Sequence, residues 1–141
     1  MKPDFSYAAS VVRCVDGDTV TLDIDCGFSI YTRQTTRLYG IDTPETRMVR
    51  GGSQDLKSLG KLAKHFVQDA LPVGTEVTIK THKEGKFGRI LAKIYIDGED
   101  ESLNDLLIEK KMAVKYYGQS KDLILEQHKM CVAYHKKIGN I

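Results

Sequence analysis

The run RLYGIDTPE at residues 37–45 decides how the chain is organised around its candidate site. Its first five residues have the pattern of the end of a buried strand. Pro44 cannot continue that strand, because proline lacks an N–H donor and fixes φ at about −65°. We therefore expect a turn that brings Asp42 and Glu45 close together on a loop supported by a rigid strand. Two neighbouring carboxylates repel, so the sequence predicts a positive partner, either Arg37 or a bound cation.

A second pair of carboxylates lies upstream, in the tight turn Asp16-Gly17-Asp18-Thr19. This turn joins two runs, 8–15 and 19–25, whose alternating β-branched and polar residues predict antiparallel strands. A third predicted strand, 29–39, returns to the turn. We therefore expect carboxylates from the two turns to meet at one end of a three-stranded meander.

The rest of the chain predicts three helices and two further strands. The serines at positions 53, 102 and 120 are good N-caps, and Pro72 ends the first helix. The order β-β-β-α-β-β-α-α is typical of an α+β protein with a five-stranded OB-fold barrel of Greek-key type and three helices. Periodicity alone leaves several α+β arrangements open. The predicted elements are strands 76–81 and 89–96, and helices 53–71, 103–111 and one that starts at 120.

Length and composition fit one globular domain spanning residues 1–141. The chain is 41% hydrophobic and 28% charged, which argues against a disordered, fibrous or membrane protein. Its net charge of +2 is weak evidence for a nucleic-acid partner. The N-terminus carries Asp4 and no apolar segment, so we expect a cytoplasmic protein, or a secreted one if a signal has been removed. We expect no membrane partner and a monomer.

The residue types at the two turns suit a metal ion. The carboxylates of Asp18 and Asp42 are hard oxygen ligands that fit Ca²⁺ or Mg²⁺. The backbone carbonyl of Thr43 could add a third ligand. In isolation, either motif could equally be an ordinary tight turn.

Three further charged residues suit phosphate chemistry. Arg37 and Arg89 carry planar, permanently charged forks that match two oxygens of a phosphate. Glu45 could orient or deprotonate a water molecule. The structural alternative is a set of ion pairs, with Arg37 bound to Glu45 and Arg89 bound to Asp97.

The motifs DGDT, RLYGIDTPE and KFGR, in this order, resemble the thermonuclease (staphylococcal nuclease-like) family from about Ser10 to the end of the chain. The resemblance implies the OB-fold and a Ca²⁺-dependent nuclease that hydrolyses phosphodiester bonds of DNA and RNA to 3′-phosphate and 5′-hydroxyl products. The alternative is a non-catalytic OB-fold module that binds nucleic acid. The implied site residues are the Ca²⁺ ligands Asp18, Asp42 and Thr43 and the catalytic Arg37, Glu45 and Arg89.

The same resemblance places Lys86, Phe87, Tyr116 and Tyr117 where family members contact the terminal phosphate and base of the substrate. Aromatic stacking tolerates any base and favours unpaired strands. Phe87 stands where the best-known family member has tyrosine, so the stacking surface is kept and a hydroxyl contact is lost.

One face of the third predicted helix carries His128, Cys131 and His135. A thiol and two imidazoles could bind zinc, but helical geometry makes their convergence on one ion poor. Because Ile124 and Ile138 continue the same stripe, packing is the favoured interpretation. The three cysteines of the chain lack a CxxC spacing and are expected to be reduced thiols.

Overall fold

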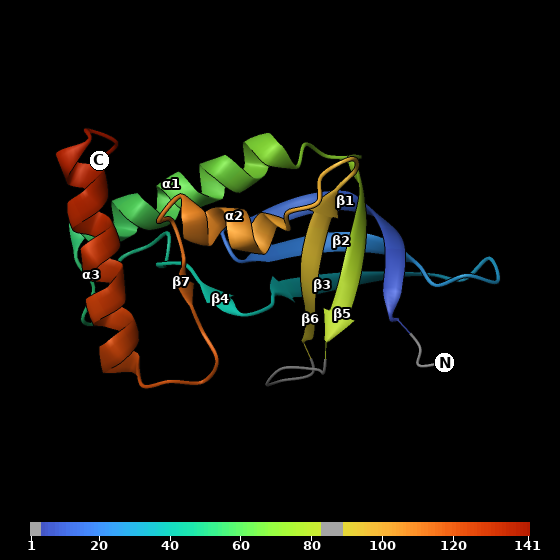
Figure 1. The fold of residues 1–141 in the computed structure, drawn as a ribbon, viewed down its shortest axis with the longest axis horizontal. Coiled ribbons are helices and arrows are strands. Elements are labelled where there is room, and N and C mark those ends of the chain that lie inside the picture. The colour runs from blue at the N-terminus through green and yellow to red at the C-terminus, as the bar shows by residue number, and fades with distance from the viewer. Residues whose placement is uncertain (1–3, 83–88) are drawn as a thin grey trace.

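The structure, a computed structural model, describes residues 4–82 and 89–141. Five of its strands form a closed barrel in which neighbours are antiparallel, except for one parallel pair (Figure 1). These strands are β1 (Ser6–Asp16), β2 (Thr19–Asp25), β3 (Tyr31–Leu38), β5 (Glu76–His82) and β6 (Ile90–Ile96). Their order around the barrel is β1-β2-β3-β6-β5, and the parallel pair is β3 with β6.

Apolar side chains at alternating positions along the strands fill the interior of the barrel, as the sequence predicts. In β2, Val20, Leu22 and Ile24 are buried, and the residues between them are partly exposed. A polar residue also points inward: Thr36 of β3 is buried, and its hydroxyl donates a hydrogen bond of 2.9 Å to the carbonyl of Val20. The hydroxyl is therefore satisfied inside the core.

The described residues form three helices, all capped by the predicted serines. The first two pack against the barrel, and the third packs against the first (Figure 1). They are α1 (Gln54–Ala70), α2 (Leu103–Glu109) and α3 (Lys121–Lys137). Each serine side chain accepts a hydrogen bond from the backbone N–H three residues later, which satisfies one of the free donors at the helix start. The predicted α+β class, five-stranded barrel and three helices are confirmed.

A buried asparagine ties α2 to the barrel. Asn104 is fully buried, and its Nδ2 donates to the carbonyls of Tyr39 and Ala92 at 2.9 and 3.1 Å. Its Oδ1 accepts from the N–H of Ile94 at 3.2 Å. The Ala92 carbonyl also accepts from the N–H of Tyr39 at 2.9 Å, so Asn104 adds a side-chain link where the segment after β3 meets β6.

A small antiparallel pair outside the barrel was not predicted from sequence. It joins β4 (Ile41–Asp42) to β7 (Val114–Lys115), which Figure 1 shows beside α3, away from the barrel strands. Two-residue strands carry no periodicity, so the pattern of the sequence gives no sign of them. The pair fixes the backbone of Asp42, one of the candidate site residues.

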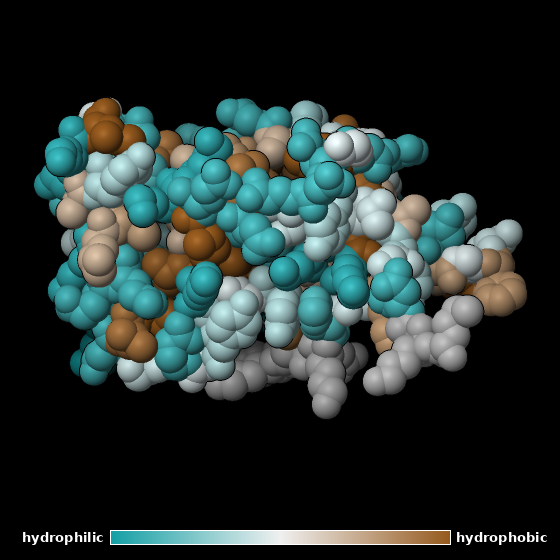
Figure 2. All heavy atoms as spheres, viewed as in Figure 1, coloured by the Kyte–Doolittle hydropathy of each residue, from teal (hydrophilic) through white to brown (hydrophobic). Residues whose placement is uncertain are grey.

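Several element boundaries differ from the sequence prediction by one or two residues. The third strand begins at Tyr31 instead of residue 29, because Phe28 and Ser29 adopt positive φ angles of 56° and 61° in the hairpin turn. The last residue of the predicted stripe on α3, Ile138, is 51% exposed. Figure 2 shows a mostly hydrophilic face, with apolar side chains at the tip of the β2–β3 hairpin, where Phe28 is 97% exposed.

Among the residues that the structure describes, none of the helices has the length and apolar character needed to cross a membrane.

Candidate active site

Asp18, in the turn between β1 and β2, is a largely buried carboxylate whose side chain is 13% exposed. Its Oδ1 accepts from the Thr19 hydroxyl at 3.0 Å, and its Oδ2 accepts from the backbone N–H of Thr43 at 3.3 Å. Burial raises the pKa of the Asp18 carboxyl, and the negative charge of Asp42 adds to the rise, while Arg37 opposes it. Additional positive charge at this place would therefore stabilise the ionised form.

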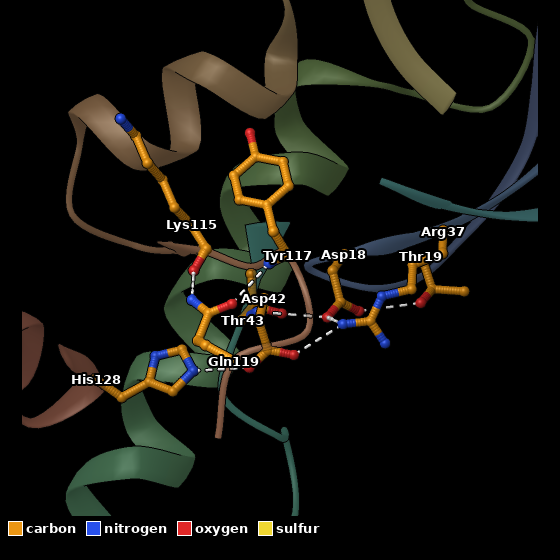
Figure 3. Close-up of polar contacts among 9 residues, drawn as sticks. All are labelled: Asp18, Thr19, Arg37, Asp42, Thr43, Lys115, Tyr117, Gln119 and His128. Carbon is orange, nitrogen blue, oxygen red and sulfur yellow. Dashed lines mark hydrogen bonds and ion pairs between the residues drawn. The ribbon is translucent and has the colours of Figure 1, made fainter. Parts of the chain in front are cut away.

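Arg37 connects the two turns. It lies opposite Thr19 in the β2–β3 ladder, and its Nη2 donates to Asp42 Oδ1 at 2.8 Å and lies 3.7 Å from Asp18 Oδ2 (Figure 3). The sequence predicted Arg37 or a bound cation as the positive partner of Asp42 and Glu45. The structure pairs Arg37 with Asp42 and, in place of Glu45, with Asp18. The alternative pair of Arg37 with Glu45 is not among the ion pairs of the described residues.

His128 on α3 belongs to the same cluster, which the sequence analysis missed. Its Nε2 lies 2.8 Å from Asp42 Oδ2, and its side chain is only 6% exposed (Figure 3). An ionised carboxylate accepts only, so Nε2 carries the proton of this hydrogen bond. Both oxygens of Asp42 are thus held, one by Arg37 and one by His128. The apolar stripe from Ile124 to Ile138 on this helix predicted that His128 packs in the protein interior. The spacing of the stripe gives no sign that His128 faces a carboxylate.

The donor atoms here fit a hard divalent cation. Asp18 and Asp42 present carboxylate oxygens, and Thr43 is buried beside Asp18. The described part of the chain holds no group of three or more His, Cys, Asp and Glu side chains suited to a metal, so a cation here would have two carboxylates at most. Few protein ligands predict weak, exchangeable binding.

The zinc alternative on α3 finds no support in the structure. His128 turns to Asp42, whereas Nε2 of His135 lies 3.1 Å from the carbonyls of both Lys110 and Lys111, just after α2. His135 therefore joins α3 to the end of α2, and for this residue the packing interpretation is confirmed.

Small residues let both site turns approach α1 closely. A Cβ atom added at Gly60 of α1 would lie 2.5 Å from the carbonyl oxygens of Pro44 and Glu45. A Cβ added at Gly17 would lie 2.9 Å from Ala63, also on α1. The helix thus sets the position of the turn that carries Asp18 and of the loop that carries Glu45.

Glu45 lies on that loop with its side chain exposed. Its pKa is raised, first by partial desolvation and then by the negative charges of Asp18 and Asp16. Solvent screens these effects at an exposed group, so the rise in pKa makes Glu45 only a somewhat stronger base. The Thr46 hydroxyl donates to Asp16 at 3.1 Å and ties the loop to the first turn.

The predicted substrate-binding residues divide into two groups. Tyr116 and Tyr117 line a pocket of about 380 Å³ next to the site, together with Arg37 and Arg89, and with Leu38 and Leu91 among its apolar walls. The ring centroid of Tyr116 lies 5.5 Å from the Arg37 guanidinium carbon, a cation–π contact. We call this the tyrosine pocket. Lys86 and Phe87 lie outside the described residues.

Known proteins are similar in sequence to most of this chain. The family described as "Staphylococcal nuclease homologue" matches residues 35–138. An uncharacterized protein of Methanocaldococcus jannaschii is 31% identical over 114 residues, which cover 70% of this chain and 53% of that protein. Thermonucleases of Staphylococcus hyicus and Staphylococcus intermedius are 32% and 33% identical over 110 residues, 76% of this chain and 59% of each.

An OB-type barrel with carboxylates and an arginine at one end places this protein among the nuclease-like OB-fold proteins. The chain belongs to the staphylococcal nuclease family. It spans 53–59% of the length of the relatives described above. Family membership supports a nuclease-like function.

Proposed function

We propose that this protein is a Ca²⁺-dependent nuclease that hydrolyses phosphodiester bonds of DNA and RNA, with single strands favoured. The observation that carries the proposal is the convergence of Asp18 and Asp42, from two separate turns, on one nitrogen of Arg37. Cation-binding carboxylates beside a phosphate-binding arginine are what hydrolysis of a phosphodiester requires. The products proposed are a 3′-phosphate and a 5′-hydroxyl.

Asp18, Asp42 and the backbone carbonyl of Thr43 would hold the Ca²⁺ ion. When bound, the ion would act as a Lewis acid on the phosphate. His128 and Arg37 would keep the Asp42 carboxylate in one orientation, because each binds a different oxygen of it. Holding a ligand through its hydrogen-bond partners commonly raises metal affinity.

Part of the Arg37 guanidinium group is available to bind substrate. Its ion pairs with Asp18 and Asp42 both run through Nη2, which leaves the N–H groups of Nε and Nη1 for phosphate oxygens. Arg89 lines the adjoining tyrosine pocket and would bind the same phosphate from that side. Two guanidinium groups would stabilise the extra negative charge that develops on the phosphate as a water attacks.

Glu45 would take the proton of the attacking water. Its raised pKa makes it a stronger base than an ordinary glutamate, and the loop contact with Gly60 fixes its backbone. The proton would pass from the water to the carboxylate as the oxygen–phosphorus bond forms. The bond to the departing 5′ oxygen breaks, and that oxygen takes up a proton from solvent to give the 5′-hydroxyl.

Release of acid-soluble nucleotides from denatured DNA tests the proposal. We expect cleavage with Ca²⁺ and none with a chelator, with Mg²⁺ as a further comparison. Arg37→Ala should lower the rate at least about 100-fold, the usual effect of removing one group that stabilises developing charge. Arg33→Ala is the matched control, because Arg33 lies on the same strand and pairs with Asp23 on the barrel surface.

Two outcomes would contradict the proposal. Full activity of Arg37→Ala would show that this site does not carry out the reaction. Salt-sensitive binding of DNA without cleavage would instead favour the non-catalytic OB-fold module. Labelling of the product ends with a kinase, before and after phosphatase treatment, separates a 3′-phosphate product from a 5′-phosphate one.

A further inference from the structure

A second pocket adjoins the candidate site on the side of α1 and α3, whereas the tyrosine pocket is lined by the ends of the barrel strands β3 and β6 and by residues 116–118. It measures about 390 Å³, within the range of roughly 300–1,000 Å³ typical of ligand sites. Its walls come from the connector 44–53 and from the first turns of α1 and α3. Arg37 and Tyr116 line both pockets, so the two cavities meet at these two residues. We call the second cavity the basic pocket.

The charges of the basic pocket suit a polyanion. Arg37, Asp42 and Glu45 of its lining already belong to the candidate site. The remaining lining has four cations and one carboxylate, Asp122, so a positive excess extends beyond the catalytic residues. The four cations are Arg47, Arg50, Lys57 and Lys121.

The basic pocket also has an apolar wall, which a free phosphate or a metal ion would not need. Leu56 of α1 faces the pocket from one side, and Ile124 and Leu125 of α3 line it as well. A nucleoside phosphate presents a flat apolar base beside a charged group. The lining matches that combination.

His128 adds a polar group to the same lining. Its side chain is 6% exposed, its Nε2 is bound to Asp42, and its Nδ1 has no hydrogen-bond partner among the described residues. A buried polar atom without a partner is costly unless a ligand or water supplies one. This unpaired nitrogen belongs to a residue that lines the basic pocket.

The geometry points to a second nucleoside subsite, and this inference rests on the proposed function. Every phosphodiester carries one nucleoside on each side of the scissile phosphate. With that phosphate at Arg37 and one nucleoside in the tyrosine pocket, the chain continues on the opposite side of Arg37. We propose that the basic pocket binds the nucleoside and the next backbone phosphate on that opposite side.

Substrates that differ by one nucleoside test this subsite. The dinucleotide pdTpdTp fills both pockets and carries the next backbone phosphate on either side, whereas thymidine 3′-phosphate 5′-(methyl phosphate) and thymidine 5′-phosphate 3′-(methyl phosphate) each carry a single nucleoside with its outer phosphate. The double variant Arg50→Ala/Lys121→Ala should lower kcat/KM for pdTpdTp about tenfold relative to one of the two esters, because it removes cations that would bind the next backbone phosphate. The ester whose nucleoside lies in the basic pocket should change together with the dinucleotide.

A variant with the same loss of charge is the control. Lys61→Ala/Lys129→Ala removes two exposed lysines of α1 and α3 that line neither of the two pockets, so all three substrates should keep their relative rates. An equal loss on all three substrates with Arg50→Ala/Lys121→Ala would overturn the inference, because it would show a general field effect.

Binding without turnover separates this inference from the proposed function. In chelator, fluorescence anisotropy of a labelled thymidine tetranucleotide should show about tenfold weaker binding to Arg50→Ala/Lys121→Ala than to the control variant. The slope of log affinity against log salt should also fall, because about 0.7 counterions per phosphate contact are released from a single strand. If this binding pattern appears without cleavage, the nuclease proposal is wrong, but the second nucleoside subsite is still supported. Unchanged binding would sink the pocket.

Discussion

Replacing Gly60 with alanine should disable the site while leaving the barrel intact. The new Cβ would lie 2.5 Å from the carbonyl oxygens of Pro44 and Glu45, whereas ordinary contact begins at 3.4 Å. The loop or the helix must therefore shift by roughly 0.5–1 Å, because neither carbonyl is the flexible end of a side chain. The loop carries Glu45, so the shift displaces the residue that we propose as the base.

The size of the effect follows from this displacement. Misplacement of a reacting group by about 1 Å costs on the order of 100-fold in rate, so kcat should fall about 10- to 100-fold. Alanine favours a helix over glycine by about 1 kcal/mol, which offsets part of the steric cost. The melting temperature should thus change by only a few degrees.

Acid-soluble nucleotide release and thermal unfolding, measured on the same preparations, check both parts of this prediction. Lys61→Ala, at the next position of α1 but exposed, is the control and should behave as the unmodified protein. A Gly60→Ala variant with unchanged kcat would refute the reasoning that α1 sets the position of Glu45. A variant that is inactive only because it is unfolded would show in the melting curve.

Three further predictions concern other parts of the molecule. Asn104→Ala removes three hydrogen bonds in the core. Each buried hydrogen bond contributes about 1 kcal/mol, and the backbone groups left unpaired cost extra. Urea titrations should therefore show a free energy of unfolding lower by about 3 kcal/mol or more. His128→Leu removes the hydrogen bond to one oxygen of Asp42, so calorimetry should show Ca²⁺ binding about tenfold weaker. His128→Gln should keep a Ca²⁺ affinity closer to that of the unmodified protein. Equal affinities for all three proteins would contradict this positioning role. Burial raises the pKa of the Cys14 thiol to about 11 from an ordinary 9.0, so at pH 8 a disulfide reagent should modify the exposed Cys26 first. The folded state holds the Cys14 proton more tightly than the unfolded state, so stability should fall as pH rises from 9 towards 11, and Cys14→Ala should flatten that fall.

Much of the fold could be predicted because its signals are local. The alternation of Val20, Leu22 and Ile24 gave the second strand with its final boundaries, since a half-buried strand repeats every two residues. The serine caps gave the starts of all three helices, because the cap hydrogen bond reaches only three residues along the chain. Positive φ angles at Phe28 and Ser29 could not be predicted, because neither residue favours them and the closure of the hairpin imposes them.

The candidate site was predicted in part. The turns, the strand register and the order of the motifs are properties of neighbouring residues, and they indicated that Asp18, Asp42 and Arg37 would meet. His128 lies 86 residues from its partner Asp42, and its spacing on α3 is that of a packed residue, so no local signal separates the two roles. Gly60 is likewise an ordinary helix position until the loop at Glu45 is placed against it.

The sequence by itself thus determined the types and approximate bounds of the main helices and barrel strands and the chemistry of the central charged residues, because periodicity, capping and proline act over a few residues. Only the tertiary structure decided which helix supports each site turn, that both oxygens of Asp42 are held, and that two pockets meet at Arg37 and Tyr116. These features depend on how α1 and α3 pack beside the barrel. Such packing is set by contacts between residues far apart in the chain, which no short pattern records.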